Sequence, residues 1–447
     1  MLFGLGLVIL IIGWIYKAYY QTWLNPGSLF SLLWGGIFFL YAFKLFQIYD
    51  VSINTIVIFC TGIISFLIGC FPIKLTFRLT KNAAFGNHQK QKFELGTTER
   101  KIFLLLSAIA TVVLLIRALK VLPFWVGGAR AVKQANAEGY VSYSSWLSIL
   151  YMFFANPIQT LSVFVIAVDC FFGKDAYKKP QIMLTLCMLV FGYIGSGSKF
   201  SLFVPIYSFS IVYLIYRNKK HRNEKTGYYL NKISPIKRFL VAVLLLILLV
   251  FIIYMMSQKK ESNGFVGSLY TYLVGCLPCG DHAIIDMKSS GEKYHGFVSL
   301  NGAFRVISHL FRLVGINLPY NVKMEEAYNS MVLYEKAINI TPTIKYNAFI
   351  SIFAYFYKDG GIFAVIIGSL IFGRASHYIY RKYRDDKDEY SFLLYLFDCY
   401  LILFSVVRMQ LFLSPANMVL FYIVLIFRKK TGVYKLCAKK KIHLKAI

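Results

Sequence analysis

The residues best suited to chemistry lie on one amphipathic segment, residues 297–315. Apolar side chains recur along it at helical spacing, namely Leu300, Phe304, Ile307, Phe311 and Val314. The opposite face of the same helix carries Arg305, Ser308, His309 and Arg312. Because guanidinium groups bind phosphate oxygens in a bidentate fork, two arginines with a histidine between them could hold a pyrophosphate. The alternative is an interfacial helix whose polar face meets water and lipid headgroups.

A second candidate is the turn Gly195-Ser196-Gly197-Ser198-Lys199. Glycine and serine let the backbone turn tightly, and the amides of such a turn can form an anion-binding concavity. Lys199 would add a cation at the start of a helix, where the helix dipole also favours an anion. A plain hairpin between two membrane spans would have the same composition, so this alternative stays open.

A third candidate is the aromatic run from Tyr346 to Tyr357, which is too short to span a membrane and ends at Lys358-Asp359-Gly360-Gly361. We expect a half-helix that packs against a helical bundle. Its aromatic side chains could stack on sugar rings, or they could form an ordinary aromatic belt at the membrane interface.

Two polar features lie in or beside apolar runs. Asp398 falls near the middle of a predicted span, where an ionisable group is costly and is usually partnered or functional. Cys276 and Cys279 form a CxxC pair, but a structural zinc site needs a second pair, which the sequence lacks. We therefore expect two thiols or a local disulfide, and no metal.

The elements that position these residues are predicted to be membrane helices. The chain of 447 residues is 58% hydrophobic and 17% aromatic, with a mean hydropathy of +0.59. Continuous apolar runs of roughly 17–25 residues are typical of transmembrane helices, and they favour helices over a barrel. We expect an all-α polytopic bundle of about eleven spans, or twelve. The spans are predicted at residues 3–16, 28–43, 52–72, 101–118, 146–172, 181–196, 200–216, 238–256, 361–380, 390–407 and 415–427.

The net charge of +29 follows from the distribution of basic loops. Lysine and arginine concentrate after the third, fifth, seventh, ninth and last spans, which places all five basic segments in the cytoplasm. Residues 1–447 then form one membrane domain with a first outer loop at 119–145, a large outer loop at 257–346 and a basic cytoplasmic tail at 428–447. Since topology and anionic lipid explain the charge, we expect no nucleic acid partner.

This order of features resembles the O-antigen and capsule repeat-unit polymerases of the Wzy type, which are similar to other GT-C-like integral-membrane glycosyltransferases. Those proteins have about a dozen spans, two large periplasmic loops and basic cytoplasmic loops. The matching segments are Gly128-Ala129-Arg130 with Gly139, the turn at 195–199, and Asn347-Ala348-Phe349 with Phe353 and Tyr357-Lys358-Asp359-Gly360-Gly361.

The resemblance implies transfer of a nascent glycan from undecaprenyl pyrophosphate to the next lipid-linked repeat unit. The reaction would take place at the outer face of the bacterial cytoplasmic membrane, without a cofactor. Its implied partners are the lipid-linked donor and acceptor, the bilayer, a chain-length regulator and a flippase. The candidate residues for pyrophosphate are Arg130, Lys199, Arg305, Arg312 and Arg408. The candidate bases are His309, Asp359 and His295, and the candidates for sugar stacking are Tyr346, Phe349 and Tyr357.

Two other functions stay open. An O-antigen ligase would share the fold and the donor but would use the lipid A core as acceptor. A lipid-linked oligosaccharide flippase or other transporter would be expected to show internal repeats and a polar cavity at the midplane. We find no repeat, and Asp398 is the only clear charge in the middle of a span. We therefore favour transfer over transport.

Overall fold

The computed structural model describes residues 2–72, 97–172, 178–198, 200–224, 264–342, 344–346, 350–386 and 388–428. The predicted span at 238–256 and residues 429–447 of the basic tail lie outside this part of the chain. The described part is helical apart from two short paired strands, β1 (Ile338–Asn339) and β2 (Lys345–Tyr346). The predicted all-α class is confirmed at this level.

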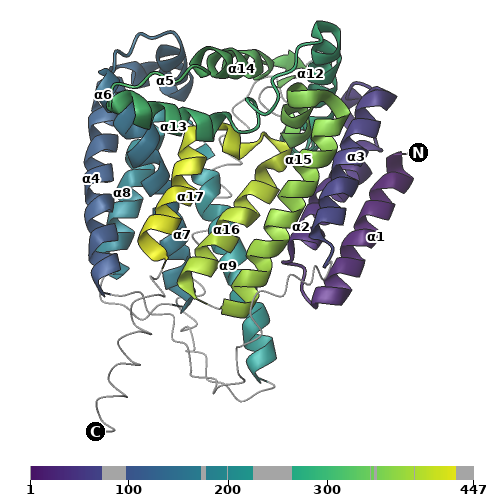
Figure 1. The fold of residues 1–447 in the computed structure, drawn as a ribbon, viewed down its shortest axis with the longest axis horizontal. Helices are drawn as coiled ribbons and strands as arrows, with labels where there is room; N and C mark the ends of the chain where they lie inside the picture. The colour runs from purple at the N-terminus through teal and green to yellow at the C-terminus, as the bar shows by residue number, and fades with distance from the viewer. Residues whose placement is uncertain are drawn as a thin grey trace.

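Among the described residues, ten helices stand side by side as a bundle (Figure 1). They are α1 (Leu2–Tyr20), α2 (Pro26–Tyr41), α3 (Ile53–Cys70), α4 (Thr97–Val121), α7 (Asn156–Phe172), α8 (Lys178–Ser196), α9 (Phe200–Glu224), α15 (Ser351–Asp386), α16 (Glu389–Leu403) and α17 (Ser414–Phe427). Each of them coincides with one of the predicted spans.

Within the part of the chain that the structure describes, six helical segments are long and apolar enough to cross a membrane, by length and composition. They are Leu2–Tyr20, Ile53–Cys70, Glu99–Gly127, Ser145–Phe172, Ser351–Asp386 and Glu389–Val406. Two shorter apolar helices, Pro26–Tyr41 and Ser414–Phe427, stand among them. The chain therefore carries helices suited to a bilayer, and the number of eleven spans stays a prediction.

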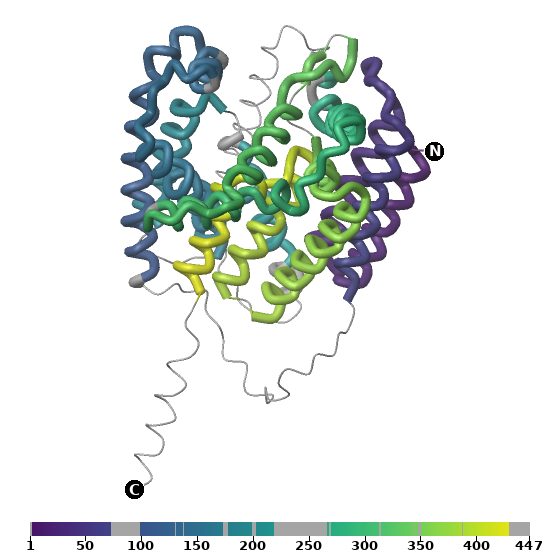
Figure 2. The backbone as a smooth tube through the Cα atoms, turned by 45° about the horizontal axis from the view of Figure 1, so that its top comes forward, coloured from purple at the N-terminus to yellow at the C-terminus, as the bar shows by residue number. Residues whose placement is uncertain are grey.

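Shorter helices cover one end of the bundle (Figure 1). They are α5 (Gly128–Ala137), α12 (Cys276–Ser290), α13 (Asn301–Leu313) and α14 (Asn321–Tyr334). α11 (Gly264–Val274) directly precedes α12, and α6 (Ser145–Leu150) is the start of the apolar segment Ser145–Phe172. A π-helical turn, Tyr151–Ala155, joins α6 to α7. Figure 2 shows the green segment of the large outer loop lying across this end, between the blue helices and the purple helices.

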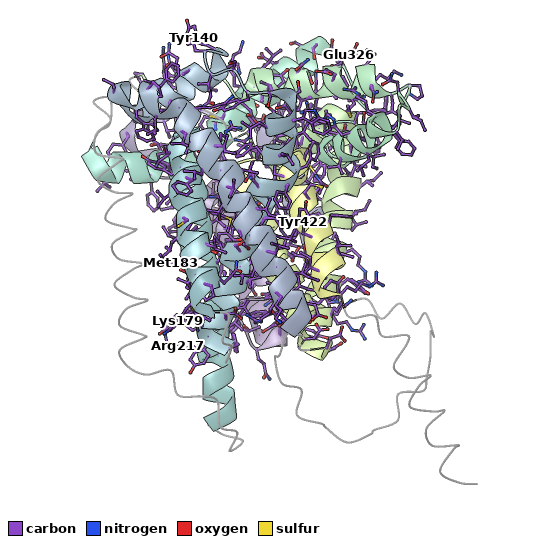
Figure 3. The ribbon with its side chains drawn as sticks, turned by 90° about the vertical axis from the view of Figure 1, so that its left-hand side faces the viewer. Tyr140, Lys179, Met183, Arg217, Glu326 and Tyr422 are labelled. Carbon is purple, nitrogen blue, oxygen red and sulfur yellow. The ribbon has the colours of Figure 1, made fainter. Side chains whose placement is uncertain are left out.

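The two ends of the bundle differ as the predicted topology requires. Tyr140 of the first outer loop and Glu326 of the large outer loop lie at one end, whereas Lys179 and Arg217 lie toward the other (Figure 3). The two predicted outer loops thus share one end, and basic residues predicted to be cytoplasmic are near the opposite end. We call the end that carries α12, α13 and α14 the capped end.

Small residues let neighbouring helices approach closely. Gly69 of α3 and Gly373 of α15 each lie so close to the backbone of the other helix that a Cβ at either position would collide with it. Aromatic side chains of the same core, among them Trp34, Phe59 and Phe353, are fully buried and pack against one another. Close backbone approach at small residues is a common way for membrane helices to associate.

The aromatic run before the ninth predicted span is helical, but its start differs from the prediction. The helix begins at Ser351 rather than at Tyr346, because Lys345 and Tyr346 pair with Asn339 and Ile338 as β2 and β1. The predicted break at the two glycines is confirmed: Gly360 and Gly361 depart from helical geometry, and Gly361 has φ 67° and ψ −150°. A side chain would be strained in that conformation.

Candidate functional site

Helix α13 crosses the capped end of the bundle (Figure 1). The burial of its side chains shows that most of its polar face is turned toward the protein. Asn301 and Ser308 are buried, and Arg305 and His309 are half-buried. The apolar face points outward: Ile307 is 40% exposed, Leu310 59% and Val314 71%. A helix lying on a protein surface in water would have the opposite polarity. The arrangement suits a helix whose outer face meets hydrocarbon and whose inner face carries polar groups into the protein.

Specific contacts fix α13 in this orientation. Ser308 Oγ donates a hydrogen bond to Asn321 Oδ1 at 2.6 Å, and Asn301 Nδ2 donates to the carbonyl of Met324 at 2.8 Å. Gly302 lies against the backbone at Leu411 and Leu413, where a Cβ would have no room. The helix is therefore held from α14 on one side and from the segment before α17 on the other. The helix begins at Asn301 rather than at residue 297 as predicted, because residues 296–300 form a turn.

His309 packs edge-on against the Phe153 ring, with 4.9 Å between the ring centroids. Partial burial lowers the pKa of His309, and the positive charges of Arg312 and Arg305 lower it further. The imidazole is therefore neutral at neutral pH, with a lone pair that can accept a proton. Phe153 belongs to the π-helical turn Tyr151–Ala155, a kind of distortion that is frequent at functional sites.

A row of aromatic rings links Arg305 to the other side of the capped end. The Arg305 guanidinium lies 4.1 Å from the centre of the Tyr328 ring, as in a cation–π contact. Tyr328 stacks on Phe412 at 5.3 Å, and Phe412 meets Tyr355 at 5.0 Å. We call Tyr328, Phe412 and Tyr355 the aromatic bridge. Phe412 and Tyr355 are fully buried and Tyr328 is half-buried, so the bridge packs α14, the segment before α17 and the start of α15 together.

Arg408 lies at the far end of the aromatic bridge. Its Nη1 donates to Glu335 Oε1 at 2.9 Å, and the Tyr355 hydroxyl donates to the same oxygen at 3.3 Å. Arg408 and Glu335 are each 22% exposed. The charge of Arg408 is therefore already paired with Glu335, and a bound phosphate would compete with Glu335 for the guanidinium group. The structure thus brings two of the predicted cations, Arg305 and Arg408, onto one aromatic bridge, whereas Arg312 is exposed on the surface.

Asp359 holds the backbone that leads into α13. Its Oδ1 accepts the N–H groups of Gly296 and Val298 at 2.9 Å each, and its Oδ2 accepts the N–H of Ser299 at 2.8 Å. The side chain is 4% exposed. A carboxylate that already accepts three backbone donors is better placed to order a loop than to take a proton from a substrate.

His295, the third predicted base, is exposed at the edge of this turn. Its backbone has φ 51°, and its N–H donates to the carbonyl of Asp359 at 2.8 Å. Asp359 belongs to α15 and His295 to the turn before α13, whereas His309 lies on α13 itself, one helical turn from Arg305. Of the three predicted bases, His309 has the geometry that fits the role.

The turn at 195–199 packs against the first outer loop. Asn136 Nδ2 donates to the carbonyl of Gly195 at 3.3 Å. Gly197 has φ 60°, and a Cβ there would lie 2.6 Å from the carbonyl oxygen of Ala129. The turn and α5 therefore meet, as a shared site would require. The Lys199 residue and the Arg130 side chain lie outside the part of the chain that the structure describes.

Arg117 is a cation at this position that sequence reasoning missed. Its guanidinium lies 3.8 Å from the centre of the Tyr151 ring and 4.4 Å from that of Tyr143. Its side chain also lies beside Gly195, where a Cβ would be 3.4 Å from Arg117 Cγ. Among the described residues, Arg117 Nε has no hydrogen-bond partner. The signal in the sequence was an arginine at the predicted outer end of a span, which is contrary to the positive-inside pattern.

The residues predicted to stack on sugars lie mostly in the core. Tyr346 is 5% exposed, and its ring packs against Tyr272 at 5.1 Å between centroids, so neither face is free for a sugar. Tyr357 is half-buried against the same core, and Phe349 lies outside the described residues. The aromatic half-helix therefore builds the bundle in this structure, and the prediction of stacking by Tyr346 is corrected.

The remaining polar features have local partners. Ser376 Oγ donates to Asp398 Oδ1 at 2.7 Å between α15 and α16. Cys276 and Cys279 are buried free thiols of α12, so the alternative of a disulfide is wrong. Within the described ranges, no group of three or more His, Cys, Asp or Glu residues could hold a metal ion.

Comparison with known proteins gives no further guide. No family model matches this chain, no curated protein matches it, and no solved structure matches it.

Proposed function

We propose that this chain polymerises undecaprenyl-pyrophosphate-linked oligosaccharide repeat units into O-antigen or capsular polysaccharide at the outer face of the bacterial cytoplasmic membrane. The observation that carries the proposal is the inward-turned polar face of α13, with Arg305 on the aromatic bridge that also meets Arg408. Cations and a neutral imidazole thereby gather at one end of a helical bundle suited to a bilayer.

The chemistry assigns a role to each group. The acceptor hydroxyl attacks the anomeric carbon of the donor, His309 Nδ1 or Nε2 takes the hydroxyl proton, and the bond from the anomeric carbon to pyrophosphate breaks with its electron pair on the phosphate oxygen. Arg305 and Arg408 stabilise the negative charge that develops on the leaving undecaprenyl pyrophosphate. Arg117 is a further cation for the second lipid-linked substrate, because it lies beside the turn at 195–199.

The outer face of α13 supports a lipid-linked substrate. Exposed apolar side chains line it, namely Ile307, Leu310 and Phe311 within the helix and Leu300 and Val314 at its two ends, and Arg312 is the exposed cation among them. An undecaprenyl chain can stay in hydrocarbon against this face while its pyrophosphate reaches the polar side of the same helix. The short crossing distance from one face of a helix to the other, about 10 Å, suits a substrate that is half lipid and half sugar.

The test is the glycan pattern of a strain in which the gene is deleted, read on a gel. The proposal predicts single repeat units attached to the lipid A core or to the cell surface, with long polymer lost. Free lipid-linked polymer in the deletion strain would indicate a ligase. Long polymer at the wild-type level on its normal acceptor would contradict both activities.

A further inference from the structure

A pocket that the site above does not use lies between α12 and the segment at 333–338. Its volume is about 200 Å³, and its lining residues are Cys279, His282, Ala283, Asp286, Leu333, Tyr334 and Ile338. The four lining residues of α12 fall three, four and seven positions apart, so they share one face of the helix. The second wall comes from the end of α14 and from β1.

The polar groups of this pocket are few and complementary. Asp286 offers acceptor oxygens, His282 can donate or accept, and Tyr334 offers a hydroxyl and an aromatic ring. His282 Nδ1 and Asp286 Oδ2 are 3.6 Å apart, too far for a hydrogen bond, and the two side chains are 55% and 52% exposed. Burial and the nearby charge of Asp286 raise the pKa of Tyr334, so its hydroxyl keeps its proton and remains a donor.

The polar and apolar groups that line the pocket favour one class of small ligand over others. An anion would be repelled by Asp286. Cys279, His282 and Asp286 all line the pocket, but among the described residues no group of three or more His, Cys, Asp or Glu is placed to hold a metal ion. A polyhydroxylated ring needs both donors and acceptors at its edge and an apolar or aromatic surface at its face. Ala283, Leu333 and Ile338 supply that surface together with the Tyr334 ring. The volume is below the range of roughly 300–1,000 Å³ for drug-sized ligands, so one ring fits better than an oligosaccharide.

The position of the pocket relates it to the aromatic bridge. Tyr334 lines the pocket, and the next residue, Glu335, binds Arg408 and Tyr355 on the other side of the segment. We propose that the pocket formed by His282, Asp286 and Tyr334 is a subsite for a single sugar ring of the repeat unit. Its place in the reaction rests on the proposed function, since it would hold a sugar of the glycan while the pyrophosphate lies at Arg305 and Arg408.

The experiment measures sugar binding without turnover. Purified protein in lipid nanodiscs is titrated with glucose, galactose, N-acetylglucosamine, N-acetylgalactosamine and rhamnose, and binding is followed by saturation-transfer NMR. We expect at least one of these sugars to bind the wild type. Asp286→Asn removes the charged acceptor, and Ala283→Leu fills the pocket. Each should weaken that binding at least about tenfold, since a hydrogen bond to a charged group contributes about 1.5–3 kcal/mol.

Matched variants separate this inference from the proposed function. Lys288→Gln changes an exposed residue of the same helix outside the pocket and should leave sugar binding unchanged. Arg305→Ala should abolish polymer but retain sugar binding, because the pyrophosphate site and the pocket are distinct. If none of the five sugars binds, or if binding is unchanged in both Asp286→Asn and Ala283→Leu, the subsite is refuted. Sugar binding that depends on Asp286 in a protein without polymerase activity would refute the proposed function alone.

Discussion

Asp359 offers the sharpest test of how the site is built, because its two possible roles predict opposite results. In the structure its carboxylate accepts the N–H groups of Gly296, Val298 and Ser299. These bonds order the turn before α13, the helix that carries Arg305 and His309. If Asp359 orders the turn, its loss loosens the backbone locally. If Asp359 were the catalytic base, its loss would stop turnover and leave the backbone unchanged.

The expected destabilisation by Asp359→Ala follows from the burial of the three N–H donors. The bond from Val298 is buried, and those from Gly296 and Ser299 are partly buried. In Asp359→Ala the two partly buried N–H groups can regain water, and the Val298 N–H stays unsatisfied at a cost of about 1–3 kcal/mol. Together with the lost charge-assisted bonds we expect about 3 kcal/mol of local destabilisation, or roughly a hundredfold faster opening. Asp359→Asn keeps one acceptor oxygen and should cost about half as much.

Hydrogen–deuterium exchange of the peptide covering residues 295–304 measures this opening directly. We expect exchange to accelerate most in Asp359→Ala and less in Asp359→Asn. The control is Asp385→Asn at the other end of α15, where the carboxylate is 50% exposed and its arginine partners are exposed. Unchanged exchange in Asp359→Ala, with polymer lost, would refute the loop-ordering role and restore Asp359 as the base.

Three further predictions concern topology, charge and pH. Reporter fusions after Asn218 should be cytoplasmic and fusions near Ser330 external; an external reporter at Asn218 would overturn the assignment of both ends of the bundle. Arg305→Ala should lower the polymerisation rate about a hundredfold. Arg312→Ala, at an exposed position, should raise the activation free energy by less than about 1 kcal/mol. Equal effects of the two variants at equal protein levels would contradict the orientation of α13. Burial and the charges of Arg312 and Arg305 lower the pKa of His309. The active neutral imidazole therefore persists as the pH falls through about 6.5, the ordinary pKa of histidine. We expect activity to be lost only at lower pH. Arg312→Gln should move that loss to higher pH, and a pH–rate profile unchanged by Arg312→Gln would argue against His309 as the base.

Much of the fold follows from the sequence because its physical causes are local. Long apolar runs specify helices, since a backbone in hydrocarbon must satisfy its own hydrogen bonds. The pattern of residues 300–314 predicts the apolar and polar faces of α13, although Arg312 of the predicted polar face is exposed. Gly360 and Gly361 end the first part of α15 where the sequence predicts a break. These features depend on residues within a few turns of one another.

The parts that sequence could not give depend on contacts between distant segments. Tyr346 is aromatic on either interpretation, and its burial depends on distant segments, through its pairing with Ile338 and the packing of its ring against Tyr272. In the sequence Arg117 is a single charge near the end of a predicted span. Only the structure shows that its guanidinium lies against the rings of Tyr143 and Tyr151. The direction in which the polar face of α13 points depends on Asn321, Met324 and Phe153, which no periodicity within the helix reveals.

The central claim is that the protein itself joins lipid-linked repeat units, and reconstitution tests it most directly. The purified protein in liposomes is supplied with undecaprenyl-pyrophosphate-linked repeat units, and the products are resolved by mass spectrometry. The account predicts a ladder of glycans in whole multiples of the repeat unit, with one undecaprenyl pyrophosphate released per bond, and no ladder with Arg305→Ala. Only single units after incubation with correctly folded wild-type protein and its own repeat unit would contradict it.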